Sequence, residues 1–347
     1  MLKKSLKIFL VLLFIAAGIE VSLRSIGYLP GDLRPSLSYF KPVDSLVVIP
    51  DFVTNEEGIL VANRKYFNEQ GVFINEEGFR TKSFTALDST KRKLLFIGDS
   101  FTWGMSAEPF YKNSFCDLLA QDSSLEVINL GIPAADPVQY AALAEKCIPT
   151  IRPNEVFVLF FMGNDLMRKD RANTGQPYYY WTNAGAIYAD MDGRHFNSAQ
   201  SAYDYLITKK LFLRNPDNLL EWLVSKSAAL ARLYAVKFRW EEKHAFERAR
   251  THPEVTIKHL KQLVEICTAN NCTLKIVVIP EAKDANLILE KYKEKYAALL
   301  NDATLSKYFY TPQVQSSWYD EAANPHLNNQ GHFEYYQLLK TLSIPCR

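Results

Sequence analysis

The sequence predicts an α/β fold, a three-layer α/β/α sandwich around a parallel five-stranded sheet, with an additional apolar helix at the N-terminus. Two observations support this prediction. Short runs of β-branched and aromatic residues alternate with segments of helical spacing, as in parallel sheets that helices cover on both faces. The first residues combine lysines with an apolar run, which is typical of a membrane anchor.

The five predicted strands cover residues 93–97, 126–130, 155–161, 274–279 and 307–310, and segments of helical spacing at 253–269 and 285–300 precede the last two. In parallel sheets of this class, ligands bind outside the carboxyl ends of the strands. We therefore expect functional residues directly after the strands.

The N-terminal segment, residues 1–29, is predicted to be a retained signal anchor. Lys3, Lys4 and Lys7 precede an apolar run from 8 to 19, which is shorter than the ~20 residues that span a bilayer, but an extension to Leu23 with Glu20 near the interface comes close. No small-residue cleavage site follows. Positive charge before the span places the N-terminus in the cytoplasm, so the rest of the chain is expected in the periplasm or outside the cell. A buried helix of a soluble protein is the alternative.

The rest of the chain divides into two predicted parts. Residues 30–90 contain repeated turn signals and are interpreted as a linker with N-terminal strands. Residues 91–347 form the α/β domain, interrupted by an insertion at about 167–252. The insertion contains a hairpin-like stretch at 176–193 and two amphipathic helical segments around 218–240.

Composition excludes several classes of function. The formal net charge is +2 over 347 residues, so no strong field points to nucleic acid. The sequence has no P-loop, GxGxxG or HExxH motif, and we expect neither a cofactor nor a metal. The five cysteines lack CxxC spacing. Cys267 and Cys272 remain candidates for a disulfide outside the cytosol, but two ordinary thiols are the preferred interpretation.

Three of the predicted strands end in residues suited to one reaction. Ser100 follows the first strand in Gly-Asp-Ser, Gly131 follows the second, and Asn164 follows the third. His326 lies in "NPHLNNQGH", before the last helical segment. Taken singly, each motif also fits a tight turn or a helix cap. Together they provide a serine nucleophile, an imidazole base and candidate oxyanion donors.

In this order the four residues resemble the SGNH, or GDSL, hydrolase family, over residues 91–342. The resemblance implies a flavodoxin-like sandwich and a Ser100 acyl-enzyme, with His326 as the base. It implies three oxyanion donors: the backbone N–H groups of Ser100 and Gly131, and the side-chain amide of Asn164. The other histidine of the motif, His332, is expected to be structural.

One position departs from the family pattern. The aspartate that usually precedes the histidine and orients it is replaced by Asn324. An asparagine carbonyl can accept from the ring and fix its tautomer, but it offers no full negative charge. We expect a slow enzyme unless Asp320 or Glu321 replaces the missing acid.

The resemblance extends to anchored proteins associated with O-acetylation of cell-surface polysaccharides, through the anchor, "GFR" at 78–80, the GDSFTxG motif and an aromatic insertion. The expected function is thus hydrolysis or transfer of an ester acyl group, with an acylated carbohydrate or a small ester as substrate and a membrane acyltransferase as a candidate partner. The aromatic residues at 178–181 either stack on a sugar or pack the insertion onto the domain. The alternative function is a binding or assembly module with impaired catalysis.

Overall fold

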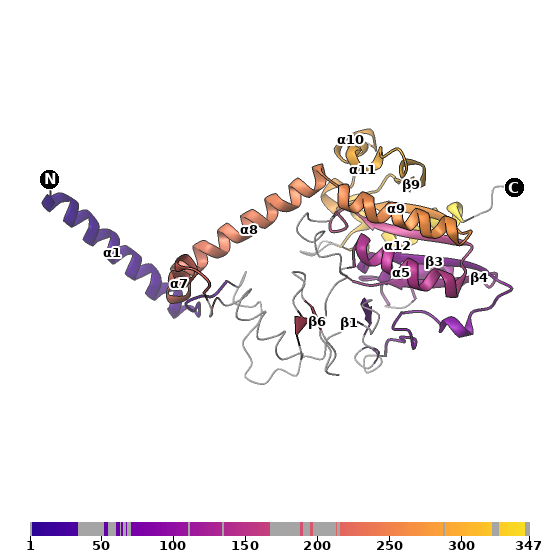
Figure 1. Cartoon of the computed structure of the whole chain (residues 1–347), viewed down its shortest axis with the longest axis horizontal. Coiled ribbons are helices and arrows are strands. Elements are labelled where there is room, and N and C mark those ends of the chain that lie inside the picture. Colours follow the sequence, from indigo (N-terminus) through magenta and orange to yellow (C-terminus); the bar gives the residue numbers. More distant parts are fainter. Residues whose placement is uncertain are drawn as a thin grey trace. The chain divides into compact units, whose positions relative to one another are not determined.

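The computed structural model describes residues 2–33, 52–54, 60–62, 64, 67, 71–109, 112–133, 135–166, 188–189, 195–196, 213, 216–286, 289–320 and 326–343. The chain divides into two compact units (Figure 1). The first combines Met1–Val48 with Phe196–Ala245, and the second combines Ile49–His195 with Phe246–Arg347.

A five-stranded parallel sheet forms the centre of the second unit. Its strands are, in spatial order, β4 (Leu125–Gly131), β3 (Arg92–Gly98), β5 (Glu155–Phe161), β8 (Thr273–Ile279) and β9 (Phe309–Tyr310). Every neighbouring pair is parallel. Gly98 of β3 lies opposite Gly131 of β4, so the carboxyl ends of these strands lie at one edge. The predicted parallel sheet of five strands is confirmed.

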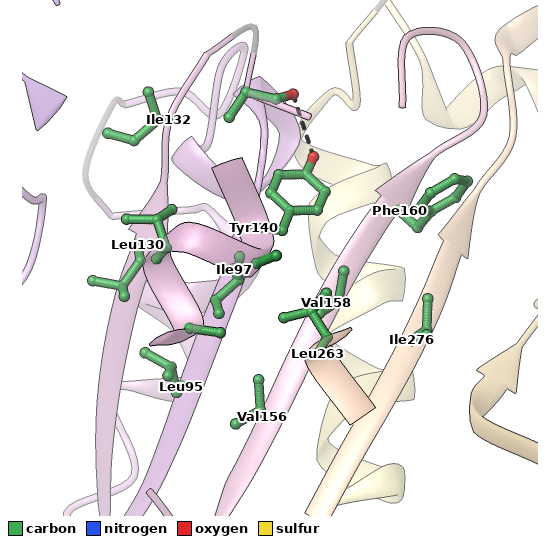
Figure 2. Packing of buried hydrophobic residues seen from close by; sticks show 14 of the residues in the cluster. Leu95, Ile97, Leu130, Ile132, Tyr140, Val156, Val158, Phe160, Leu263 and Ile276 are labelled. Atoms are coloured by element: carbon green, nitrogen blue, oxygen red, sulfur yellow. Dashed lines mark hydrogen bonds between the residues drawn. The ribbon is translucent and has the colours of Figure 1, made fainter. Parts of the chain in front are cut away.

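Helices α5 (Pro137–Ile151) and α9 (Glu254–Ala269) cover one face of the sheet. Successive strand residues point to opposite faces, and alternate residues of β3 and β5, such as Leu95 and Val156, face these helices (Figure 2). The apolar side chains between the sheet and the helices include Leu95, Ile97, Leu130, Tyr140, Val156, Val158, Leu263 and Ile276.

The opposite face is covered by the short helices α3 (Ser100–Trp103) and α4 (Phe115–Leu119) and by α12 (Asn329–Leu342). The intervening strand residues, including Phe96, Phe157 and Leu159, pack there against Phe115 and Tyr335. Helices thus cover both faces, and the predicted three-layer sandwich is confirmed. The predicted helical segment 285–300 consists of two shorter helices, α10 (Leu289–Lys295) and α11 (Ala297–Leu300).

Part of the predicted linker packs into this core. Strands β1 (Phe52–Thr54) and β2 (Leu60–Ala62) form an antiparallel pair, and Val61, Ile74 and Phe79 are buried in the cluster that α5 and α9 cover. Arg80 then donates from Nη2 to Ser114 Oγ at 3.0 Å and to Asp117 Oδ2 at 3.2 Å. These residues therefore belong to the folded domain. The described part of the second unit also contains short 3₁₀ turns at Phe84–Ala86, Ala282–Asp284, Ser306–Tyr308 and Ser316–Trp318.

The first unit contains α1 (Leu2–Ser25), α7 (Leu219–Lys226) and most of α8 (Ala228–Thr251). Residues Leu6–Ser25 of α1 are long and apolar enough to cross a membrane, with a mean hydropathy of 2.3.

In the predicted insertion, β6 (Tyr188–Ala189) and β7 (His195–Phe196) form a two-stranded sheet. The rest of the predicted hairpin, with the aromatic residues at 178–181, lies outside the described residues. The cysteines at 116, 147, 267 and 272 are buried and are not joined in disulfides.

Candidate active site

The turn after β3 places Ser100 at the carboxyl edge of the sheet. Asp99 is the N-cap of α3, and its Oδ1 accepts the N–H of Phe101 at 3.0 Å. Ser100 is therefore the first residue of the helix, where a backbone N–H has no acceptor within the helix. A side chain at Gly98 would lie 2.0 Å from Thr102 Oγ1 and 3.0 Å from the carbonyl oxygen of Leu159. Only glycine permits so tight a turn from strand to helix.

His326 reaches Ser100 from the far end of the chain. Its Nε2 lies 2.9 Å from Ser100 Oγ, although the two residues are 226 positions apart. Both residues are buried, at 8% and 7% exposure, and the Phe101 ring packs against the imidazole with the centroids 5.0 Å apart. The predicted nucleophile and base are thus brought together.

The loop before α12 holds the histidine through its backbone. The N–H of Asp320 donates to the His326 carbonyl oxygen at 2.9 Å, and Tyr319 pairs with Leu327 in an isolated antiparallel bridge. Asn328 then caps α12 by accepting from the Gly331 N–H. Within the described residues the Asp320 carboxylate makes no hydrogen bond, so its link to His326 is through the main chain. Asn324 and Glu321, the other candidates for orienting the ring, lie outside the described residues.

Asn164 lies beside the same turn, in the segment that follows β5. Its Nδ2 donates to Asp99 Oδ2 at 3.0 Å. A primary amide carries two N–H groups, so one can be held by Asp99 while the other serves a substrate. Asp99 therefore caps the helix that carries the nucleophile and also holds the predicted oxyanion donor. Sequence reasoning placed Asp99 only in a turn, because its contact with Asn164 spans 65 positions.

The backbone N–H of Gly131, a predicted oxyanion donor, already has an acceptor in this structure. It donates to Asn129 Oδ1 at 2.8 Å, so Asn129 would have to release it before it could serve a substrate. Asn129 is itself held by a hydrogen bond from its Nδ2 to the carbonyl oxygen of Thr102. A Cβ at position 131 would lie 2.4 Å from the Trp103 nitrogen. The glycine is required because β4 packs directly on the backbone of α3.

Two buried carboxyl groups give the site an unusual electrostatic environment. Burial raises the pKa of Asp99 to about 7, against the opposing effect of its hydrogen bonds from Phe101 and Asn164. Burial and the nearby Asp99 also raise the pKa of Asp165 well above its usual value. The oxygens of Asp165 accept from Tyr140 Oη and the Phe161 N–H, both at 2.8 Å. Asp165 thereby fixes the segment that carries Asn164.

His332 supports the turn after α3 and does not touch Ser100 in any described contact. It is fully buried, and its Nε2 lies 3.2 Å from the carbonyl oxygen of Met105, whose N–H donates to the Ser100 carbonyl oxygen at 3.0 Å. Burial lowers the pKa of His332 to about 4, so the ring is neutral at pH 7. The expected structural role is consistent with these contacts. Among the described residues no cluster of His, Cys, Asp or Glu is arranged to hold a metal ion.

No family model matches the chain, and no curated protein is similar to it. Several solved structures align with it. A GDSL-like lipase from Bacteroides thetaiotaomicron is 11% identical, with 81% of this chain and 96% of that chain covered and a TM-score of 0.37. A lipase/acylhydrolase from Enterococcus faecalis is 12% identical, with coverages of 72% and 94% and a TM-score of 0.36.

A family 3 carbohydrate esterase from Clostridium thermocellum is also 12% identical, with coverages of 72% and 94% and a TM-score of 0.34. TM-scores and identities this low carry no argument about activity or substrate. The functional proposal therefore rests on contacts within this chain, namely those of Ser100, His326, Asp99 and Asn164.

Substituting Gly131 tests whether packing is the reason for glycine. Gly131→Ala keeps the backbone N–H but forces a methyl group against the backbone of α3, and we expect a loss of roughly 1–3 kcal/mol in stability, as for other overpacked sites. Urea unfolding measures this loss. If the variant is as stable as the native protein, the packing account is wrong.

The raised pKa of Asp99 predicts a stability that falls with pH. The unfolded carboxyl titrates near 3.8 and the folded one near 7, so the folded protein binds more protons between these values. The stability associated with the protonated group is present below pH 4 and is lost as pH rises through 7. The melting temperature of the native protein should therefore decline as pH rises from 4 to 7. In Asp99→Asn part of this decline should be absent, because the titrating carboxyl is gone.

Asp122→Asn is the matched control. Hydrogen bonds from Ser124 lower the pKa of this exposed carboxyl, so its loss should leave the decline between pH 4 and 7 in place. An unchanged decline in Asp99→Asn would show that Asp99 is not the titrating group.

Proposed function

We propose that the chain is an SGNH-type serine esterase or acyltransferase that acts through an acyl-enzyme on Ser100. The observation that carries the proposal is the 2.9 Å contact between Ser100 Oγ and His326 Nε2 at the carboxyl edge of the sheet. A serine hydroxyl is a weak nucleophile near neutral pH and needs an adjacent base. The distance is that of a hydrogen bond through which the base can take the hydroxyl proton.

The reaction has two halves. Ser100 Oγ attacks the ester carbonyl carbon while its proton passes to His326 Nε2, and the resulting tetrahedral oxyanion is met by preorganised donors. The candidate donors are the N–H of Ser100 and the Asn164 amide, with the N–H of Gly131 as a third once Asn129 releases it. The imidazolium then protonates the leaving alkoxide, which departs as an alcohol. Water or an acceptor hydroxyl next attacks the acyl-enzyme and gives its proton to His326. The imidazolium returns that proton to Ser100 Oγ as the bond to the acyl carbon breaks, which releases an acid or a new ester and restores the free enzyme.

The substrate class is proposed to be O-acyl groups of a cell-surface polysaccharide. This proposal is supported by the apolar helix α1 together with Lys3, Lys4 and Lys7 before it, which favour an external location for the rest of the chain. The sequence resemblance to anchored proteins associated with polysaccharide O-acetylation points to the same substrates. A membrane acyltransferase is the proposed partner.

The proposal is tested by ester turnover and by covalent labelling. The full chain should hydrolyse p-nitrophenyl acetate and react with a fluorophosphonate, and both should be abolished in Ser100→Ala. Loss of His326 should reduce turnover by several orders of magnitude. Asp88→Ala serves as the control and should be fully active, because Asp88 precedes β3 and Ser100 follows the opposite, carboxyl end of that strand. If the native chain neither turns over esters nor reacts, a binding or assembly module replaces the enzyme as the best interpretation.

Asn324 is proposed to make this enzyme slow. Replacing the triad aspartate with asparagine in a serine protease lowers kcat by about 10⁴-fold, while the oxyanion hole and substrate binding retain roughly 10³ to 10⁴-fold over water. Asn324→Asp should therefore raise kcat, because a carboxylate stabilises the imidazolium that forms during attack.

The measurement is kcat for p-nitrophenyl acetate in Asn324→Asp, Asp320→Ala and Glu321→Ala. A raised kcat in the first, with native rates in the other two, supports Asn324 as the partner of His326. If Asn324→Asp leaves kcat unchanged and one acidic variant is inactive, that acid is the third member of the triad.

A further inference from the structure

Glu20, near the end of the apolar span of α1, caps a different helix. Its Oε1 and Oε2 accept the N–H groups of Ala228 and Ala229, both at 3.0 Å, and Ser227 Oγ donates to Oε2 at 2.8 Å. These N–H groups open α8 and have no acceptor within it. A carboxylate is also favoured there by the helix dipole. With Arg24 Nε donating at 2.7 Å, the charge of Glu20 is satisfied within the protein.

Further contacts fasten α7 to the same end of α1 (Figure 1). The N–H of Gly31 donates to the carbonyl oxygen of Val224 at 3.0 Å, and Gly31 O accepts from Leu213 at 2.7 Å. The Arg232 guanidinium lies over the Tyr28 ring at 4.5 Å. Gly31 has a φ of +74°, and a Cβ there would lie 2.7 Å from Leu213 O. The segment after α1 is therefore shaped to hold α7 and the start of α8.

The first half of α8 has its small residues inside and its large ones outside. Three alanines are buried, Ala228, Ala231 and Ala235. The opposite face exposes a stripe at helical spacing, with exposures of 68% for Leu233, 59% for Val236 and 61% for Trp240. A helix in water normally shows the reverse pattern, with its large apolar side chains facing the core. This arrangement indicates that the outer face meets an apolar medium.

Helix α7 continues the exposed apolar surface. It exposes four large apolar side chains and buries only Val224 among its residues; the exposed ones are Leu219, Leu220, Trp222 and Leu223. We call α7 and the first half of α8, residues 219–240, the foot. Large apolar side chains exposed in this number mark an interaction site.

Charge separates the foot from the rest of α8. Residues 241–251 contain Glu241, Glu242, Lys243, Glu247, Arg248 and Arg250. Among the α8 side chains that the structure describes, Trp240 is the last large apolar one that is exposed. Within the foot the charged residues are Glu221, Lys226, Arg232, Lys237 and Arg239, which leaves an excess of positive charge. Tryptophan at the boundary and basic residues beside an apolar stripe are the composition of a helix that lies in the interface of a membrane.

We propose that the foot inserts its apolar side chains into the headgroup region of the bilayer that α1 spans. The inference rests on the anchor role proposed for α1. Glu20 precedes the end of the span at Ser25 by ~8 Å at 1.5 Å per residue, so the start of α8 is fixed beside the last turns of the span. Lipid is favoured over a partner protein because the foot is hydrogen-bonded to the element that enters the bilayer.

The same contacts explain how a short apolar run can anchor the chain. The run from 8 to 19 covers ~18 Å, well short of the ~30 Å hydrocarbon core. Because the charge of Glu20 is paired with Arg24 and with the N-terminus of α8, Glu20 can enter the outer part of the hydrocarbon, ~8 Å from the end of the span. The whole of Leu6–Ser25 then becomes usable as a span. The foot then widens the membrane contact around a single helix.

Depth-dependent fluorescence quenching tests the proposal on the full chain. Single cysteines are introduced in a Cys346→Ser background, in which the four remaining thiols are buried, and labelled with the environment-sensitive dye NBD. The labelled sites are Leu233→Cys and Val236→Cys in the foot, Leu12→Cys in α1, and Glu265→Cys on the exposed face of α9 as a water control. Each protein is reconstituted into phosphatidylethanolamine and phosphatidylglycerol vesicles that contain lipids with doxyl quenchers near the headgroup or deep in the chain.

We expect shallow quenchers to reduce the fluorescence at positions 233 and 236, deep quenchers to act more strongly at position 12, and neither to act at position 265. Quenching at position 12 without quenching at 233 and 236 overturns the foot and keeps the anchor. No quenching at any site overturns both. The emission of the label at 233 could instead shift to the blue without any quenching by the lipid quenchers. That result would show that protein, from a partner or a second copy, covers the stripe instead of lipid, and it would overturn the proposal.

The contacts of Glu20 provide a second test. Glu20→Ala removes the cap of α8 and should reduce quenching by the shallow quencher at position 233. Quenching by the deep quencher at position 12 should stay unchanged. Glu20→Gln retains a carbonyl acceptor and should retain most of the quenching. Equal quenching in all three proteins would show that the cap does not hold the foot at the membrane. Turnover of p-nitrophenyl acetate, measured on the same samples, reports on Ser100 separately, so a failure of the foot and a failure of the esterase proposal are distinguishable.

Discussion

The hydrogen bonds of the Asp99 carboxylate organise the candidate site. One oxygen caps α3 through the Phe101 N–H, and the other accepts from Asn164. The first contact fixes where the helix begins, and therefore where Ser100 lies. The second fixes the amide that follows β5. A single side chain thus sets the relative position of the nucleophile and a candidate oxyanion donor, a separation on which transition-state stabilisation depends.

Burial of that carboxylate has an electrostatic cost that the surrounding groups only partly offset. The pKa of Asp99 remains raised to about 7 despite its two hydrogen bonds, and Asp165 is buried nearby. Asp165 is held by Tyr140 and by the N–H of Phe161, so the strand end that carries Asn164 depends on a second buried acid. Groups held at such a cost are typical of functional sites, where geometry takes precedence over stability.

Much of this architecture could be predicted from the sequence because it depends on local patterns. The apolar runs and the turn residues after them locate the strand ends, and parallel pairing then brings those ends to one edge. The contact between Ser100 and His326 follows from that topology and from the resemblance of their motifs. The position of Gly131 was also predicted, and its predicted role as an oxyanion donor depends on the contact of its N–H with Asn129.

The missed features all depend on side-chain partners that no local pattern specifies. Whether the N–H of Gly131 is free depends on the rotamer of Asn129, which a hydrogen bond to Thr102 selects. A glycine after a strand has the same sequence signature whether it admits a substrate or the backbone of another helix. The cap that Glu20 provides joins positions 207 apart in the chain. In the sequence, Glu20 was only a charge that interrupts an apolar run.

Comparison of Trp103 with Trp222 and Trp240 shows how exposure distinguishes a folded core from a surface that needs another medium. Trp103 is buried between the sheet and the residues before it, where Phe67 packs on its ring at 5.1 Å. Trp222 and Trp240 are about half exposed or more, at 49% and 61%, each beside exposed leucine or valine. Burying a large apolar side chain is worth roughly 1.5–3 kcal/mol, so a row of them left in water on an ordered helix would forgo a substantial stabilisation. The alanines on the opposite face of α8 show that the helix does not lack apolar contacts inside the protein; its large side chains are the ones directed outward. That division of sizes is the reason to assign the outer face to an apolar medium, and it is independent of the chemistry at Ser100.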